Sequence, residues 1–364
     1  MDASHLDPAK VDYAALEVPL TRAEIRDFHA RIRSAQRTDP SISTGLTTAT
    51  SVISIIAIVG FVGIFFLIFG VTIVGGLITS SVAGSVDGGS IGIELFFLLL
   101  FAVIAFVVFR SLFGSGGNWA KWLRLTRFAG ANGLQFRTRS ANPEYPGCVF
   151  NLGDTRQATD HFSTVEGRYL DFGNYQYSTG SGKNRTTRHW GFLAMQLDRN
   201  LPNIVLDSKA NNSLFGSTNL PATFSRDQVL SLEGDFDRYF TLYCPKEYEQ
   251  DALYVFTPDL MALLIDDAAP FDVEIIDSWL LVYSASPFDM LSTSTYQRLF
   301  RIVQTVGSKA VSQTARYHDD RVASAAANIV APQGQRLRHG VSVSTLVIGA
   351  IFAAFWLWST FHGS

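Results

Sequence analysis

The chain combines two kinds of hydrophobic pattern. Three long stretches are almost entirely apolar: residues 52–78, 91–109 and 341–361. Because about 20 apolar residues cross a bilayer as a helix, each stretch predicts a transmembrane helix. Residues 134–330 differ, since their short apolar runs alternate with polar positions and end at turn residues, which is typical of a folded domain.

The positions of lysine and arginine predict how these helices are oriented. Basic residues precede the first stretch, follow the second and precede the third. The short link between the first and second stretches, which together make up the segment 49–113, has none. Because basic residues gather on the cytoplasmic side, we expect residues 1–48 and the 134–330 domain to be cytoplasmic and the C-terminus to lie outside. The sequence therefore predicts a multi-pass protein of the bacterial cytoplasmic membrane, with the lipid bilayer as a partner.

Two further helices are expected near the apolar stretches. The segment 1–48 contains a basic amphipathic helix over 21–37, where Thr21 and Glu24 have the spacing of a capping box. Its apolar face predicts packing either on the membrane surface or on the folded domain, and the sequence leaves both open. The segment 114–133 combines tryptophans with basic residues, which is typical of a helix at a membrane interface.

Residues 134–330 predict an α+β domain with a mainly antiparallel sheet and packed helices. The run 190–197 is apolar on both faces, as in a central strand, and 232–244 alternates as a half-buried strand does. We expect residues 271–275 and 279–283 to form a hairpin joined by a tight turn.

The same domain contains two helix signals. Thr257, Pro258 and Asp259 supply an N-cap, a first-turn proline and a first-turn acid, so a short helix is expected to begin there. A longer helix over 293–315 is expected because its apolar residues recur at helical spacing. Residues 331–340 are interpreted as a basic linker to the last apolar stretch.

Composition narrows the function classes. The chain of 364 residues is 47% hydrophobic and carries a net charge of −3, so its overall charge gives no reason to expect a nucleic-acid partner. Cys148 and Cys244 lie far apart and lack metal-ligand spacing. No cofactor motif is present, and no cofactor is predicted.

The stretch TGSGKNRTTRH contains most of a phosphate-binding loop, together with Lys183, Arg185, Arg188 and His189. A P-loop also needs an earlier glycine, a hydroxyl residue after the lysine and a following helix, and these are missing. We therefore expect an exposed hairpin turn. Its four basic residues are a candidate site for anions, lipid headgroups or an acidic partner.

Two other groups are candidate sites. The long loop after 206 has no clear periodicity, and its Lys209, Asn211 and Asn212 are candidates for contacting a polar ligand. Three alternating acids within 232–244 are a candidate for binding a hard cation, although such acids are more typical of the solvent face of a strand. These acids are Glu233, Asp235 and Asp237. His161 has no partner identifiable from the sequence.

Several stretches resemble a known group of proteins. The segments ALYVFTPDLMALLID and DVEIIDSWLLVYS, with TGSGKNRTTRHWG and LDSKANNSLFG, resemble uncharacterised bacterial integral membrane proteins, mostly actinobacterial. The resemblance implies no activity and no catalytic residue. Because some related proteins are associated with LemA-type membrane proteins, it implies a LemA-type protein as one partner.

Three functions follow from these observations. The leading hypothesis is a non-enzymatic inner-membrane protein whose cytoplasmic domain binds a protein partner or ligand, or a second copy of itself, in envelope maintenance or signalling. The first alternative is a membrane-anchored enzyme acting at the cytoplasmic surface. An oligomeric channel or transporter subunit is less favoured, because the spans are few and lack polar residues.

Overall fold

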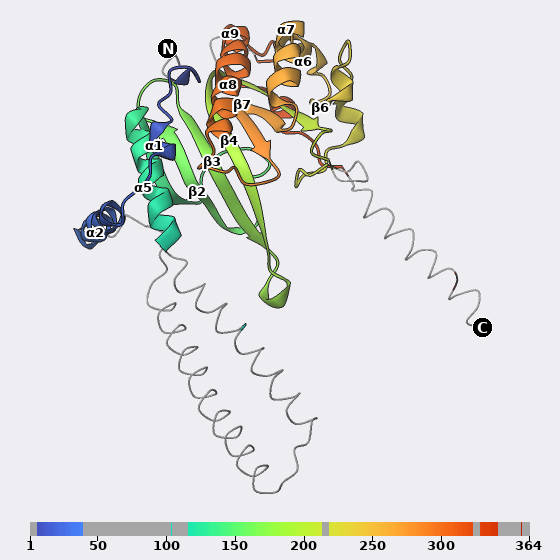
Figure 1. Cartoon of the computed structure of the whole chain (residues 1–364). Coiled ribbons are helices and arrows are strands. Elements are labelled where there is room, and N and C mark those ends of the chain that lie inside the picture. The colour runs from blue at the N-terminus through green and yellow to red at the C-terminus, as the bar shows by residue number, and fades with distance from the viewer. Residues whose placement is uncertain are drawn as a thin grey trace, which may run out of the picture. The chain divides into compact units, whose positions relative to one another are not determined.

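The computed structural model describes residues 6–38, 103, 116–212, 218–322, 328–340 and 358. The chain divides into two compact units, one of residues 20–123 and one of residues 1–19 with 124–364. The second unit contains the sheet (Figure 1).

The helices are α1 (Ala14–Glu17), α2 (Arg22–Thr38), α5 (Gly116–Ala131), α6 (Glu249–Val255), α7 (Pro258–Leu263), α8 (Thr293–Ile302), α9 (Ser308–Thr314) and α10 (Pro332–Gln335). The strands are β1 (Leu134–Ala141), β2 (Asp154–Thr164), β3 (Leu170–Thr179), β4 (Thr186–Ser208), β5 (Val229–Leu230), β6 (Phe240–Tyr243) and β7 (Asp272–Ser284).

The sheet has seven strands in the described part of the chain, in the order β1-β2-β3-β4-β6-β5, with β7 paired to β4. Each of its pairings is antiparallel. The predicted α+β class with an antiparallel sheet is therefore confirmed. The run predicted as a central strand lies in β4, which has β3 on one side and β7 on the other.

The predicted hairpin over 271–283 is wrong. These residues form one long strand, β7, that pairs with β4 from Gly191↔Ser284 to Leu206↔Val273. Asp277 takes a positive φ of 51° and interrupts the register. The extra residues of this irregularity lie on β4, where residues 197–200 lie opposite the single residue Ser278 of β7. Because the polar pair Asp277-Ser278 stands at this point, the apolar pattern of β7 resembles two short strands joined by a turn.

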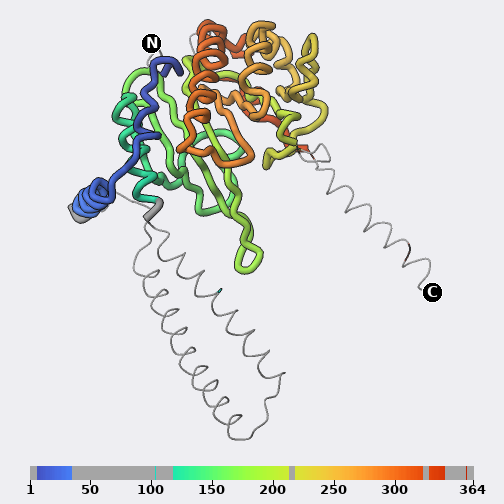
Figure 2. Tube along the Cα trace, in the orientation of Figure 1, coloured from blue at the N-terminus to red at the C-terminus, as the bar shows by residue number. Residues whose placement is uncertain are grey.

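The sheet is covered differently on its two faces. The helices α1, α5, α8 and α9 pack on one face, where the largest hydrophobic cluster lies (Figure 2). The other face carries a second cluster, covered by loop residues such as Val149, Phe150 and Phe224. The loops therefore leave room for cavities on that side, as described below.

The helix predictions within the domain are confirmed. α7 begins at Pro258 with Thr257 as N-cap. The longer helix forms α8 and α9, joined without a break by a π-helical turn, Val303–Gly307. Its expected apolar stripe is buried in the largest hydrophobic cluster.

The unit of residues 20–123 shows where the amphipathic helix packs. Thr21 and Glu24 form the expected capping box, with Thr21 N 2.8 Å from Glu24 Oε2 and Glu24 N 3.3 Å from Thr21 Oγ1. The apolar side of α2 lies on Trp119 and Leu123 of α5 through Phe28. This contact is with α5, so it decides neither of the two alternatives left open by the sequence, the membrane surface and the 134–330 domain. Trp119, expected at a membrane interface, is covered by this contact.

The prediction of three transmembrane helices requires correction. Among the residues that the structure describes, no helix combines the length and apolar character needed to cross a membrane. The predicted spans 52–78, 91–109 and 341–361 lie outside the described residues, apart from Val103 and Trp358. The multi-pass membrane localisation is corrected with them, because it depended on those helices.

Candidate functional site

The predicted basic hairpin turn is observed. β3 and β4 pair up to Thr179↔Thr186, and the turn between them has Gly180 and Gly182 at positive φ. All four basic side chains are exposed on this hairpin. Arg185 Nη2 lies 2.8 Å from Asp154 Oδ1, so one of the four charges is paired within the protein. None of the four basic residues lines either of the two cavities described below.

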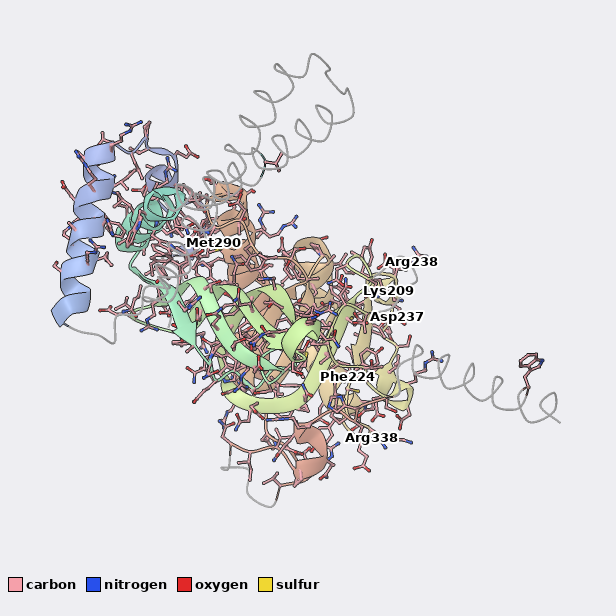
Figure 3. All side chains as sticks on the ribbon, turned by 90° about the horizontal axis from the view of Figure 1, so that it is seen from below. Lys209, Phe224, Asp237, Arg238, Met290 and Arg338 are labelled. Atoms are coloured by element: carbon pink, nitrogen blue, oxygen red, sulfur yellow. The ribbon has the colours of Figure 1, made fainter. Side chains whose placement is uncertain are left out.

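The predicted loop contacts divide into two kinds. Lys209 donates to the backbone carbonyl of Asp237 at the surface (Figure 3). The side-chain amide atoms of Asn211 and the amide oxygen of Asn212 are buried and have no hydrogen-bond partner among the described residues. Asn211 lies near Asp272, whose carboxyl is discussed below.

The candidate cation site is not supported. Instead of a strand over 232–244, the chain forms a turn and a 3-10 helix, Phe236–Arg238, before β6 begins. Asp237 accepts from the backbone N–H of Leu232 at 3.2 Å, so it caps this turn. Glu233 and Asp235 are exposed. In the described residues, no cluster of three or more His, Cys, Asp or Glu side chains is arranged to hold a metal ion.

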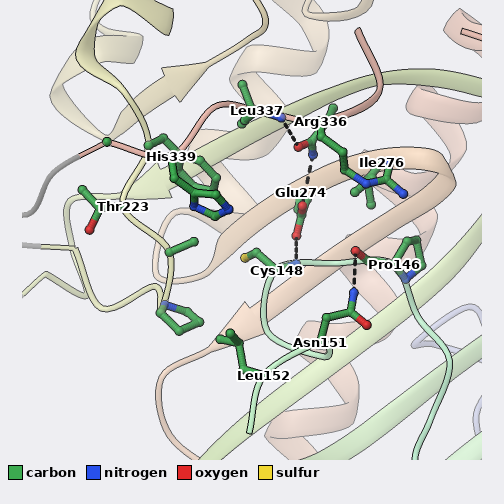
Figure 4. A pocket seen from close by; sticks show the side chains of 15 residues that line it. Pro146, Cys148, Asn151, Leu152, Thr223, Glu274, Ile276, Arg336, Leu337 and His339 are labelled. Atoms are coloured by element: carbon green, nitrogen blue, oxygen red, sulfur yellow. Dashed lines mark hydrogen bonds between the residues drawn. The ribbon is translucent and has the colours of Figure 1, made fainter. Parts of the chain in front are cut away.

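A cavity of about 800 Å³ lies on the loop-covered face of the sheet (Figure 4). Its walls come from the loop after β1, the loop before β5, β4 with β7, and the segment 336–340. They include the apolar residues Ala222, Phe224 and Ile276 beside polar ones. We call it the main cavity.

The segment 331–340, expected to be a linker, closes one wall of the main cavity. Leu337 N donates to Asn203 Oδ1 at 3.1 Å, and Gly340 N donates to the carbonyl of Thr223 at 2.8 Å. His339 stacks on Phe224 at a centroid distance of 6.4 Å. This segment is therefore part of the domain.

Glu274, at the base of the main cavity, is enclosed by hydrogen-bond donors. Its Oε2 accepts from Cys148 N and from the Tyr283 hydroxyl, each at 2.8 Å, and its Oε1 accepts from Asn203 Nδ2 at 3.0 Å. Burial raises the pKa of Glu274 and raises the pKa of the Cys148 thiol well above its ordinary value. Because its reactive thiolate form is disfavoured, Cys148 is not an activated nucleophile.

Two further acids, Asp207 and Asp272, are buried near the end of β4. Asp272 Oδ1 accepts from Ser208 N at 2.8 Å, whereas its Oδ2 is buried without a partner among the described residues. Burial raises the pKa of Asp272 to about 7 and the pKa of Asp207 to about 6. The sequence placed residues 271–275 in the first strand of a hairpin and missed that β7 is one continuous buried strand.

A smaller pocket of about 410 Å³ lies over β1, β2 and β3. Ser140 Oγ is 2.8 Å from His161 Nε2, and His161 Nδ1 is 2.8 Å from Asp171 Oδ1. The Tyr145 hydroxyl donates to Asp171 Oδ2 at 2.6 Å, and burial, followed by the Asp171 charge, raises the pKa of Tyr145. We call this the Ser140 pocket.

A bulge in β2 places His161 in this pocket. Asp160 has a φ of 47°, and the β2–β3 register shifts between Thr159 and Phe162. On β3, Gly173 passes so close that a Cβ there would lie 2.5 Å from the Cα of His161. Position 173 therefore needs glycine. The sequence signal was available: His161 and Asp171 flank a short turn, so a hairpin brings them together.

Comparisons with known proteins add little to this picture. No protein-family model matches the chain, and no curated protein sequence matches it. Among solved structures, the crystal structure of the mycobacterial trehalose monomycolate transport factor A, TtfA, aligns with 50% of this chain and 93% of its own. The sequence identity is 11% and the TM-score is 0.32, a level of likeness that supports no conclusion about fold or function. The resemblance stated from sequence motifs stays a prediction.

Proposed function

We propose that this domain is a binding domain whose ligand is a small amphipathic molecule held in the main cavity. The observation that carries the proposal is a cavity of about 800 Å³, within the size range of small-molecule sites. Its walls are largely loops, which is typical of binding surfaces carried by a rigid sheet.

The chemistry of the walls favours a ligand with a hydrogen-bond-accepting or anionic end. The carboxylate of Glu274 already accepts from three protein donors, and Asn151 Nδ2 donates to the Pro146 carbonyl at 3.1 Å. The remaining polar wall includes Thr223 and His339, which carry donor groups, and Arg336, whose guanidinium already donates to both carboxylate oxygens of Asp277 at 3.0 Å. Ala222 and Phe224 offer an apolar surface for the body of the ligand.

The test uses the full chain and the fluorescent probe 1-anilinonaphthalene-8-sulfonate, which has an apolar body and an anionic end. Ala222→Trp fills the main cavity, whereas Ala285→Trp adds the same bulk at an exposed turn. We expect the probe to bind the folded wild type and the Ala285→Trp control, and to bind Ala222→Trp at least about tenfold more weakly, a loss of about 1.4 kcal/mol.

Urea unfolding of both variants shows whether each is folded. Equal probe binding by two folded tryptophan variants would contradict the proposal, as would the absence of binding to the wild type.

A further inference from the structure

The Ser140 pocket contains a proton-transfer chain whose direction follows from the hydrogen bonds. A carboxylate has no proton to donate, so in the 2.8 Å contact His161 Nδ1 is the donor and Asp171 Oδ1 the acceptor. When the imidazole carries a single proton, Nε2 has the lone pair, and in the 2.8 Å contact with Ser140 Oγ the serine hydroxyl donates to His161.

The three side chains also differ in burial. In nucleophilic catalysis the acid and the base are shielded and the nucleophile is accessible, and the same order holds here. The side chains of Asp171 and His161 are 5% and 3% exposed, whereas Ser140 is half-buried and lines the pocket. The hydroxyl of Tyr145 fixes the second oxygen of Asp171 at 2.6 Å. The acid and the imidazole are thus held rigidly, and the hydroxyl is the member that a substrate can reach.

We propose that Ser140 is a nucleophile that cleaves carboxylic esters, with His161 as its general base and Asp171 as the residue that positions His161. This activity is separate from ligand binding in the main cavity. It rests on the arrangement of nucleophile, base and orienting acid that serves acyl transfer on unrelated folds.

The reaction balances in two steps. His161 Nε2 takes the Ser140 proton as Oγ attacks the ester carbonyl carbon; the ester C–O bond breaks and His161 protonates the departing alcohol. Water then gives a proton to His161 and attacks the acyl-Ser140 carbonyl. The acid leaves, and His161 returns the proton to Ser140 Oγ. The net change is ester plus water to acid plus alcohol, with no oxidant or cofactor consumed.

The pocket walls indicate the substrate class. Tyr169 and Trp279 form an aromatic wall with their rings at 87° and 5.8 Å. Arg137 pairs with His161 in the β1–β2 register and lines the same pocket, and its Nη2 donates to Gln135 Oε1 at 2.7 Å. In the proposed reaction its positive charge supplies electrostatic stabilisation to the negative charge that develops on the carbonyl oxygen. A pocket of about 410 Å³ suits a short acyl chain.

The experiment treats the full chain with a fluorophosphonate probe, which labels activated serines, and maps the adduct by peptide mass spectrometry. We expect one adduct per chain, on Ser140, and none on Ser140→Ala. The matched control is Ser178→Ala, because Ser178 is a serine on β3 bonded to another hydroxyl, Thr187 Oγ1 at 3.1 Å. It should label like the wild type.

Hydrolysis of p-nitrophenyl butyrate gives the second readout. Asp171→Asn should lower kcat at least about 100-fold with KM changed less than about twofold, because the acid orients the base and does not touch the substrate. A serine held only for structure would not label, and that result overturns the proposal. Labelling that persists in Ser140→Ala, or that maps to another serine, overturns it equally.

Discussion

Glu274 and Asp171 are two buried carboxylates in one sheet, and they differ in where their hydrogen bonds lead. The partners of Glu274, at the base of the main cavity, are a backbone amide, a phenol and a side-chain amide, and its network includes no imidazole. The network of Asp171 continues through His161 to Ser140 at the wall of a pocket. A buried acid alone therefore does not mark a reactive site; it needs a partner that can exchange a proton and reach a substrate.

The largest loss in the free energy of unfolding is expected when Glu274, the acceptor of its hydrogen-bond network, is removed. Glu274→Ala leaves the donors of Cys148, Tyr283 and Asn203 without a partner, and a buried unsatisfied donor costs about 1–3 kcal/mol, so the free energy of unfolding should fall by about 3–5 kcal/mol. Urea denaturation measures it. Glu233→Ala, at an exposed position, should change the same quantity by less than about 0.5 kcal/mol. A loss below about 1 kcal/mol for Glu274→Ala would show that the network is not formed as described.

Asp272 is an intermediate case, because one of its oxygens is bonded and the other is not. Burial raises its pKa from the ordinary 3.8 to about 7. The folded protein thus holds a proton that the unfolded chain releases near pH 4, so this contribution to stability is complete below pH 4 and is lost as the pH rises through 7.

The variant Asp272→Asn does not titrate, so it isolates this effect. Between pH 4 and 7 the wild type should lose stability relative to Asp272→Asn, on the order of 3–4 kcal/mol at about 1.4 kcal/mol for each pH unit. Urea unfolding of both proteins at each pH gives the difference. Parallel stability profiles would mean that Asp272 titrates normally in the folded state.

A smaller effect is expected in the network of Asp171. Tyr145→Phe removes the hydroxyl that donates to Asp171 Oδ2 at 2.6 Å and keeps the aromatic packing. A hydrogen bond to a buried charged group contributes roughly 1.5–3 kcal/mol, so a loss of about 2 kcal/mol is expected in chemical denaturation. A change below about 0.5 kcal/mol would show that Tyr145 does not hold the acid in place.

The smallest effect is expected where an acid is exposed. Arg185 and Asp154 form an ion pair with 44% and 63% of their side chains exposed. Exposed pairs contribute at most about 1 kcal/mol and weaken with salt, so Arg185→Ala should change the free energy of unfolding by less than that. Denaturation at low and high salt checks it. A loss above about 2 kcal/mol would show that this exposed pair stabilises the fold as strongly as the buried networks do.

The sequence predicted the parts of the fold that depend on local pattern. The helix over 293–315 follows from apolar spacing alone, and the hairpin at 180–182 follows from glycine and the missing P-loop elements. The pairing of Tyr175 with Trp190 follows from the same hairpin. Each of these features lies within one element or between two neighbouring strands.

The candidate sites depend on contacts that local pattern does not contain. The bulge at Asp160 decides which side chains meet His161, and the irregularity at Asp277 turned one strand into an apparent hairpin. Both are single residues at positive φ, and neither is a glycine. Residues 331–340 were interpreted as a basic linker. The partners of Leu337 and Gly340, Asn203 and Thr223, are more than a hundred residues away, so no local pattern indicates these contacts.

The comparison of the two carboxylates is tested most directly by the protonation of His161. Selective ¹⁵N labelling of the histidine rings in the full chain, with His161 assigned by its absence from His161→Gln, reports which ring nitrogen carries hydrogen. The account predicts that at neutral ring charge Nδ1 is protonated and Nε2 is not, because Asp171 accepts from Nδ1. It also predicts that Asp171→Asn shifts the population toward the other tautomer. A ring protonated on Nε2 in the wild type would contradict the account, since His161 could then not take a proton from Ser140.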